Sequence, residues 1–323
     1  MARVCTVFFG SGTFALPALA RLADGVADGV SPGAALVDLS AVVTAPPRPA
    51  GRRGELQPTP VALAAEARGI AILTPVSLRR EEALTELRAL GVDLVVLADY
   101  GRLVPAALLD LPRHGALNLH PSLLPRHRGA APVPATILAG DAATGVTLMR
   151  MDEGLDSGPI LAQREIPLDG TEVAPDLEAR LAVVAADLLV EMLPAWLAGT
   201  LEARPQPADG ATLTRPLRRS DGRLDPERPA VELERQVRAY QPWPGSFLEA
   251  EGERLIIWRA APVERPDENG VFVPGAGDLG ALMPLGDTLA LRTSQGLLRL
   301  DEVQPAGRRR MSGAEYRRGR REA

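Results

Sequence analysis

The sequence predicts a Rossmann-like, doubly wound α/β domain with a mostly parallel sheet, followed by a small β-barrel domain of OB-like type. Three observations support this. The 323 residues suffice for two domains at roughly 150 residues each. Apolar, strand-like runs alternate with amphipathic, helix-like patterns through the first 202 residues. After a proline-rich stretch, short β-type segments predominate to the end of the chain.

The first domain begins with an apolar run at 4–9 that ends in a glycine turn, after which Thr13 is placed to cap a helix reaching Leu22. Leu177, Leu181 and Leu188 recur at helical spacing in a much longer helix with one buried face. The expected strands are 4–9, 39–44, 70–74, 92–98, 117–119, 147–151 and 160–166. The expected helices are 13–22, 61–68, 78–90, 133–139 and 177–196.

The chain changes character near residue 203. The polar, proline-rich residues 203–214 predict a linker, so that the first domain is 1–202 and the second is 215–323. Beyond the linker, one helix at 231–239 precedes short strands. The expected strands are 247–249, 255–258, 289–292 and 297–300.

Composition excludes several classes of protein. No apolar run reaches the ~18 residues of a membrane span, and the first apolar run is shorter than that of a signal peptide, so we expect a cytoplasmic protein. The single cysteine, Cys5, excludes a disulfide framework and a multi-cysteine metal site. The sequence contains no lysine, which excludes a Schiff-base or P-loop lysine.

Charge is distributed unevenly around a net value of −5. Residues 203–323 hold 20 arginines against 18 acidic residues, whereas 1–202 are acidic. A partner rich in phosphate explains the basic second half, and so does a solvated basic tail.

The turn Gly10-Ser11-Gly12, followed by Ala15, matches the glycine pattern of dinucleotide-binding sites. The same glycines also suit any tight strand-to-helix turn. A dinucleotide site needs an acidic residue at the end of the second strand, and the sequence there is VVTAPPRP. The turn interpretation is therefore favoured, and no NAD(P) is expected.

Residues 118–129, NLHPSLLPRHRG, are the most informative segment. Asn118 and His120 are two residues apart in a strand and therefore face the same side, at the strand end where open α/β sheets bind ligands. An amide and an imidazole placed together can stabilise an oxyanion and move a proton. A surface loop with a capping asparagine and a solvated histidine is the alternative.

The acidic, glycine-containing loop 151–158 supplies a candidate third group. Asp156 in this loop can orient His120 and raise its pKa. The alternatives are an ordinary β-turn or a cation site. A metal site is disfavoured, because no second acidic cluster or histidine pair has the spacing of metal ligands.

Asn118, His120 and Asp156, together with the connecting SLLPRHRG, resemble the active-site pattern of formyltransferases that use 10-formyltetrahydrofolate as formyl donor. The resemblance implies that Asn118 donates to the oxyanion, His120 acts as imidazolium and passes a proton to the leaving nitrogen, and Asp156 holds His120 and helps to deprotonate the amine. It implies a folate co-substrate and no metal. The implied folate contacts are Ser122, Leu123, Leu124, Pro125, Tyr100, Gly101 and Asp152.

Within this family, the methionyl-tRNA formyltransferases are the most similar branch. The segments that carry this resemblance are 48–54, 130–132, 139–147, 238–245 and 304–312. They imply a monomeric enzyme that formylates the α-amine of charged initiator methionyl-tRNA. The implied tRNA contacts are Arg48, Arg52, Arg53, Arg308 and Arg309. A formyltransferase for nucleotide-sugar amines and a formyltetrahydrofolate hydrolase are the two enzymatic alternatives, and a non-catalytic RNA-binding relative is a further one.

The sequence also departs from the family pattern. Gly10-Ser11-Gly12-Thr13 stands where the family usually has Gly-Thr-Pro, and Asp99 precedes the expected folate-binding Tyr100-Gly101. Arginine replaces lysine wherever the family uses a basic residue, and arginine binds phosphate at least as well.

Overall fold

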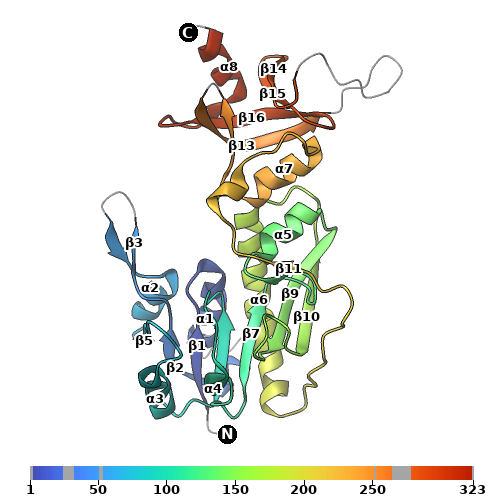
Figure 1. Ribbon diagram of the computed structural model, residues 1–323. Helices are drawn as coiled ribbons and strands as arrows, with labels where there is room; N and C mark the ends of the chain where they lie inside the picture. Colours follow the sequence, from blue (N-terminus) through green and yellow to red (C-terminus); the bar gives the residue numbers. More distant parts are fainter. Residues whose placement is uncertain (1–2, 25–32, 51–53, 251, 264–277, 322–323) are drawn as a thin grey trace. The chain divides into compact units, whose positions relative to one another are not determined.

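The computed structural model describes residues 3–24, 33–50, 54–250, 252–263 and 278–321 (Figure 1). The chain divides into two compact units. The first comprises Met1–Pro132, Ala143–Pro167 and Leu177–Arg215. The second comprises Val133–Ala142, Leu168–Asp176 and Pro216–Ala323.

A seven-stranded sheet forms the centre of the first unit, with strands in the order β10-β9-β7-β6-β1-β2-β5 (Figure 1). The strands are β1 (Val4–Phe9), β2 (Val37–Val43), β5 (Ala71–Leu73), β6 (Leu94–Ala98), β7 (Ala116–His120), β9 (Ala143–Arg150) and β10 (Ile160–Pro167). The five strands from β7 to β5 are parallel, and β9 and β10 extend the sheet antiparallel. The expected mostly parallel, Rossmann-like sheet is confirmed.

The strand order changes direction at β1, because the chain first adds β2 and β5 on one side and then returns to add β6 and β7 on the other. In open α/β sheets, ligands bind beyond the carboxyl ends of the strands at such a switch point. β7 ends at His120, so the topology brings Asn118 and His120 to the edge of the sheet that is formed by the carboxyl ends of the parallel strands.

The helices of the first unit are α1 (Leu16–Asp24), α2 (Pro60–Glu66), α3 (Glu81–Ala89), α4 (Ala106–Leu109) and most of α6 (Ala174–Leu197). Thr59 caps α2, with its hydroxyl accepting a hydrogen bond from the backbone N–H of Ala62. The expectation that Thr13 caps the first helix is wrong. A 3₁₀ turn precedes α1, and the Thr13 hydroxyl donates to Glu178 instead.

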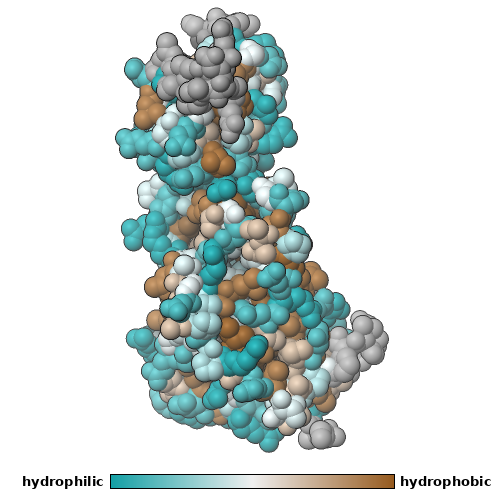
Figure 2. All heavy atoms as spheres, turned by 90° about the vertical axis from the view of Figure 1, so that its right-hand side faces the viewer, coloured by the Kyte–Doolittle hydropathy of each residue, from teal (hydrophilic) through white to brown (hydrophobic). Residues whose placement is uncertain are grey.

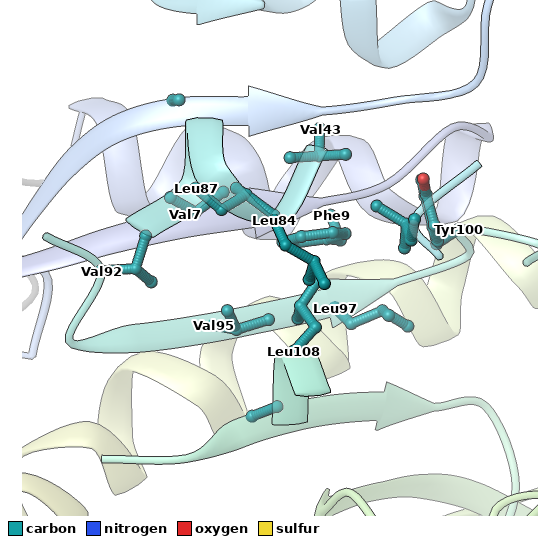
Figure 3. Packing of buried hydrophobic residues seen from close by; sticks show 13 residues of the cluster. Val7, Phe9, Val43, Leu84, Leu87, Val92, Val95, Leu97, Tyr100 and Leu108 are labelled. Carbon is teal, nitrogen blue, oxygen red and sulfur yellow. The ribbon is translucent and has the colours of Figure 1, made fainter. Parts of the chain in front are cut away.

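Alternating residues of β1, β2 and β6 face opposite sides of the sheet. Val7, Phe9 and Val95 pack with Leu84 and Leu87 of α3 (Figure 3). The residues between them, including Phe8, Val42 and Val96, are also fully buried. Both faces of these strands are therefore covered, which explains why their sequences are continuous apolar runs.

A short antiparallel pair of strands lies between β2 and α2, where the sequence predicted no strand. β3 (Arg48–Ala50) pairs with β4 (Glu55–Gln57), with Arg48 opposite Gln57. Alternation is weak in these short, exposed strands, so the pattern of the sequence did not reveal them.

The second unit contains an antiparallel half-barrel sheet in the order β12-β13-β16-β15-β14, with β17 paired to β16. The strands are β12 (Ser246–Ala250), β13 (Glu253–Val263), β14 (Leu282–Leu285), β15 (Thr288–Arg292), β16 (Leu297–Pro305) and β17 (Met311–Ser312). The helices are α5 (Pro132–Ala139), α7 (Ala230–Ala239) and α8 (Gly313–Arg321). Leu233 and Val237 of α7 pack with Ile257 and Leu298 of the sheet. The expected small β-domain is confirmed.

On the face drawn in Figure 2, hydrophilic side chains are interspersed with separate hydrophobic patches. Among the described residues, no helix combines the length and the apolar character needed to cross a bilayer.

Candidate active site

The end of β7 presents Asn118 and His120 on one side of the sheet. The two residues are only 5% and 4% exposed. They are paired with Met149 and Thr147 of β9, so their backbone positions are fixed by the antiparallel ladder. Burial of two polar side chains at a strand end is costly unless each finds a hydrogen-bond partner.

Asp156, in the loop between β9 and β10, provides that partner. Its Oδ1 accepts from Asn118 Nδ2 at 3.3 Å, and its Oδ2 lies 3.6 Å from His120 Nδ1. Oδ2 also accepts from the backbone N–H of Gly129 at 2.8 Å. The structure therefore brings the carboxylate to the imidazole and to the amide, which is 38 residues away from it in sequence.

The protonation of His120 follows from its two neighbours. Its Nε2 lies 2.9 Å from the carbonyl oxygen of His127, which only accepts, so Nε2 carries a proton. Burial lowers the pKa of His120 below its ordinary value, although the Asp156 carboxylate and this hydrogen bond act in the opposite direction. The resting imidazole is therefore neutral, with the lone pair of Nδ1 on the side of Asp156.

The charge of Asp156 acts to raise the pKa of His120 as expected, but it is not the largest influence on the pKa of the ring. The net shift is downward because β7 buries the ring so completely that loss of hydration outweighs one carboxylate. The imidazolium is consequently a transient species rather than the resting state.

The turn Ser122–Pro125 is held rigidly by two polar side chains of the neighbouring strands. The Thr147 hydroxyl donates to the Ser122 carbonyl at 2.7 Å and accepts from the Leu124 N–H at 3.1 Å. Gln163 of β10 donates to the Leu124 carbonyl at 2.9 Å. Sequence reasoning missed both Thr147 and Gln163. Thr147 is a polar residue within a buried strand, which was a signal, whereas Gln163 is an exposed residue of β10 and gave none.

Two expected folate contacts, Ser122 and Leu124, are buried, whereas Leu123 and Pro125 are partly exposed. The Ser122 hydroxyl is occupied, because it donates to the carbonyl of Arg126 at 2.6 Å. The turn therefore offers apolar side-chain surface rather than a free hydroxyl.

The remaining expected folate contacts lie on two loops. Tyr100 packs edge-on against Phe9, with ring centroids 5.4 Å apart, and Gly101 follows it with φ +70° (Figure 3). The Tyr100 hydroxyl is buried and finds no hydrogen-bond partner within the described residues. Asp152 is exposed and accepts from Gly154 N–H and the Ser157 hydroxyl, which shapes its own loop.

The glycine turn after β1 is explained by close packing. A Cβ on Gly12 would lie 1.7 Å from Oδ2 of Asp99, and a Cβ on Gly10 would lie 2.8 Å from that of Ala15. Asp99 itself has φ +46°, and desolvation, followed by the charge of Glu178, raises its pKa to about 6. Glycine is thus needed at both positions so that the side chains of Asp99 and Ala15 can pack against this turn.

The arginines expected to contact tRNA are exposed where they are described. Arg48 lies on β3, and Arg308 and Arg309 follow β16. Arg52 and Arg53 lie outside the described residues. The guanidinium of the next residue, Arg310, lies 3.4 Å from the ring centroid of Trp258. In the described part of the chain, no group of three or more metal-ligating side chains comes together.

Family models match both parts of the chain: "Formyl transferase" matches residues 3–193, and "Formyl transferase, C-terminal domain" matches residues 216–321. The chain is 46% identical to a methionyl-tRNA formyltransferase of Novosphingobium aromaticivorans, covering 97% of this chain and 96% of the relative. It is 44% identical to one of Halorhodospira halophila, with 98% and 96% covered.

Solved structures support the fold. An N-formyltransferase of Helicobacter canadensis, in complex with folinic acid and dTDP-3-aminofucose, has a TM-score of 0.62 at 15% identity, covering 93% of this chain and 99% of that one. HypX of Aquifex aeolicus in complex with tetrahydrofolic acid has a TM-score of 0.59 at 15% identity, covering 97% and 46%. With the converging amide, imidazole and carboxylate and the matches along nearly its whole length, the chain belongs to the methionyl-tRNA formyltransferase family of formyl transferases.

Proposed function

We propose that this enzyme transfers the formyl group of 10-formyltetrahydrofolate to the α-amino group of initiator methionyl-tRNA, with Asn118, His120 and Asp156 as its catalytic residues. The observation that carries the proposal is the convergence of these three side chains at the carboxyl end of β7. Extensive similarity to methionyl-tRNA formyltransferases supports the choice of substrate.

In the first step, the amine nitrogen attacks the formyl carbon, and the carbonyl electrons move to oxygen to give a tetrahedral oxyanion. Asn118 stabilises this oxyanion. One N–H of its Nδ2 is directed to Asp156 Oδ1, which leaves the second N–H for the oxyanion. The bond to Asp156 also fixes the amide's orientation before the substrate arrives, so no reorganisation is needed during the reaction.

In the second step, the proton released by the attacking amine moves to the His120–Asp156 pair. Nδ1 of neutral His120 accepts it, because Nε2 already carries a proton. The imidazolium then lies beside the Asp156 carboxylate, which stabilises its charge. When the intermediate collapses, this proton passes to N10 of the folate, and tetrahydrofolate and the formylated amine are released.

The folate lies, in this proposal, against the Ser122–Pro125 turn and the loops carrying Tyr100-Gly101 and Asp152. The rigid support of the turn by Thr147 and Gln163 favours a fixed formyl position. The pterin ring then hydrogen-bonds to backbone groups of the two loops, as is expected when side chains such as Tyr100 are committed to the core.

For the tRNA, we propose contacts from Arg48, Arg52, Arg53, Arg308 and Arg309. Exposure of Arg48, Arg308 and Arg309 supports this role, because a polyanion is bound by charges that remain accessible.

We further propose that the enzyme is a cytoplasmic monomer, and that the domains divide at 1–202, 203–214 and 215–323. Light scattering measures the mass of the particle in solution.

A formylation assay tests the function. The wild-type protein is incubated with 10-formyltetrahydrofolate and either methionyl-initiator tRNA or an amino-sugar nucleotide, and the formylated product is counted. We expect transfer to the tRNA and none to the sugar. Transfer to the sugar alone, or folate hydrolysis without any acceptor, would identify the chain as one of the two enzymatic alternatives and refute the proposal.

The Arg52→Ala variant tests the placement of tRNA. We expect the KM for tRNA to rise severalfold and the KM for folate to stay unchanged, because loss of one phosphate contact weakens only the binding of the polyanionic tRNA. Equal changes in both constants would assign this loop a structural role.

A further inference from the structure

The segment 204–214, expected to be a linker, is bound closely to the first unit. We call residues 204–214 the strap. Its first residue, Arg204, exchanges backbone hydrogen bonds with Ile160 at 2.7 and 2.9 Å. At its other end, β11 (Leu213–Thr214) forms a parallel pair with β8 (Arg128–Gly129). The strap therefore runs against both loops that contact the candidate catalytic residues.

Gln206 makes the principal side-chain contacts of the strap. Its Nε2 donates to the carbonyl oxygens of Asp156 and Gly158, both at 2.8 Å. Its Oε1 accepts from Nε and Nη2 of Arg128 at 3.0 and 2.7 Å. The side-chain amide thus uses both of its N–H groups and both lone pairs of its oxygen, and it joins two loops that are separate in sequence.

These contacts close a ring around Asp156. Gln206 holds the backbone carbonyl of Asp156, and through Arg128 it holds the neighbouring Gly129, whose N–H donates to Asp156 Oδ2. Asp156 has φ +49°, a conformation that costs a non-glycine residue energy and persists only where the surroundings impose it. Gln206 is one such constraint, and it acts on the backbone of Asp156 itself.

We propose that Gln206 is a positioning residue that sets the distance between the Asp156 carboxylate and His120 Nδ1. This inference rests on the proposed formyl transfer. Without the two bonds from Nε2, the loop relaxes toward negative φ and the carboxylate moves away from both Asn118 and His120. The geometry of the pair is then lost, whereas the turn Ser122–Pro125, the Tyr100-Gly101 loop and the tRNA contacts remain in place; of the expected substrate contacts, only Asp152 shares the disturbed loop.

Two variants separate the hydrogen bonds that Gln206 donates from those that it accepts. Gln206→Met removes all of its hydrogen bonds at similar side-chain size. Gln206→Glu keeps an acceptor for Arg128 but removes the donors to Asp156 and Gly158. The matched control is Gln241→Met, because Gln241 Nε2 likewise donates to two carbonyl oxygens, those of Val237 and Trp258, in the second unit.

We expect kcat to fall about 10- to 100-fold in both Gln206 variants, because small displacements of reacting groups cost rates of this size. We expect KM for tRNA to change less than about threefold and KM for folate to change less than kcat does, since only the Asp152 loop among the proposed substrate contacts is disturbed. Gln241→Met should leave kcat near the wild-type value, whatever it does to the melting temperature. A kcat for both Gln206 variants within twofold of the Gln241→Met control would overturn the inference.

The pH profile of kcat provides a readout that general destabilisation does not move. The charged or titratable groups acting on His120 are Asp156 and His127. Withdrawal of the Asp156 carboxylate lowers the pKa of His120 further, so the acidic limb should move to lower pH in the Gln206 variants. An unmoved limb would contradict the proposed role.

The same experiment distinguishes this inference from the proposed function. Wild-type protein and Asp156→Asn are assayed alongside. If Asp156→Asn is inactive and the Gln206 variants are fully active, Gln206 has no positioning role and the proposed chemistry stands. If Asp156→Asn retains full activity, the proposed chemistry itself is wrong.

Discussion

The candidate catalytic residues and the candidate tRNA-binding arginines occupy opposite kinds of environment. Asn118 and His120 are about 95% buried and hydrogen-bonded, and Asp156 is held by two further residues through its backbone and its carboxylate. Arg48, Arg308 and Arg309 are exposed, and the side chain of Arg309 is 77% accessible.

This difference reflects what each region has to do. Stabilising an oxyanion requires donors fixed within a fraction of an ångström in a site that excludes water, and burial provides both. Binding a large polyanion requires accessible charges that exchange counterions for phosphates, and precise geometry matters less. The two regions should therefore respond differently to substitution.

The largest effect is expected for Asp156→Asn. We expect kcat to fall by about 10²–10⁴, because the amide cannot share the proton or stabilise the imidazolium. Wild-type activity should be lost as the pH falls through the lowered pKa of His120, because Nδ1 must be unprotonated to accept the proton. The remaining activity of Asp156→Asn should show this acidic limb at still lower pH. A limb shifted upward would contradict the assignment of charges.

Asn118→Ala should lower kcat by about 10²–10³, which is the loss reported for one oxyanion donor and corresponds to about 2.7–4 kcal/mol. Binding of a non-reactive folate analogue, measured by calorimetry, should stay within a few-fold of the wild type. If kcat is unchanged, Asn118 is not the oxyanion donor, and burial at the end of β7 does not mark catalysis.

The exposed arginines should act on binding alone. For the double variant Arg308→Ala, Arg309→Ala, we expect KM for tRNA to rise about 10-fold while kcat stays within twofold. The slope of log KM against log salt should become shallower by about 1 for each phosphate contact removed. Arg113→Ala, at another exposed arginine (66% accessible) outside the proposed contacts, is the control and should leave the slope unchanged. A fall in kcat without a change in slope would remove the distinction between the regions.

The smallest effect concerns Asp99, whose pKa is raised to about 6 by desolvation and by Glu178. A raised carboxyl pKa means that the folded state disfavours the charge, so this residue costs stability increasingly between about pH 4 and pH 6 and fully above that. Asp99→Asn should therefore stabilise the fold at pH 8 by about 1 kcal/mol. The gain is modest because the Asp99 side chain, although desolvated on the side that faces its neighbours, is exposed on the other, where solvent screens its charge. At pH 4 the gain should vanish.

Denaturant unfolding at the two pH values measures this gain. Glu178→Gln serves as the control and should give a smaller gain, because the charge of Glu178 is the lesser cause of the shift. Equal free energies of unfolding for wild type and Asp99→Asn at pH 8 would show that the folded protein does not desolvate the Asp99 carboxylate.

The sequence by itself determined the order of strands and helices in the first unit, since continuous apolar runs and 3.6-residue periodicity are local signals. It also determined which side chains could perform the chemistry, because the spacing of Asn118 and His120 in a strand already places them on one side. Short exposed elements such as the β3–β4 hairpin left too weak a pattern to be recognised.

Only the tertiary structure decided how these groups are held. The pKa of His120 is lowered because burial outweighs the carboxylate, and burial depends on neighbours that lie far away in sequence. Gln206 is 50 residues from Asp156, within a polar, proline-rich stretch whose composition predicts a linker. Its side chain became recognisable as a constraint only when the fold brought three residues to it, which form four hydrogen bonds with its amide, because long-range contacts leave no periodic pattern in a single chain.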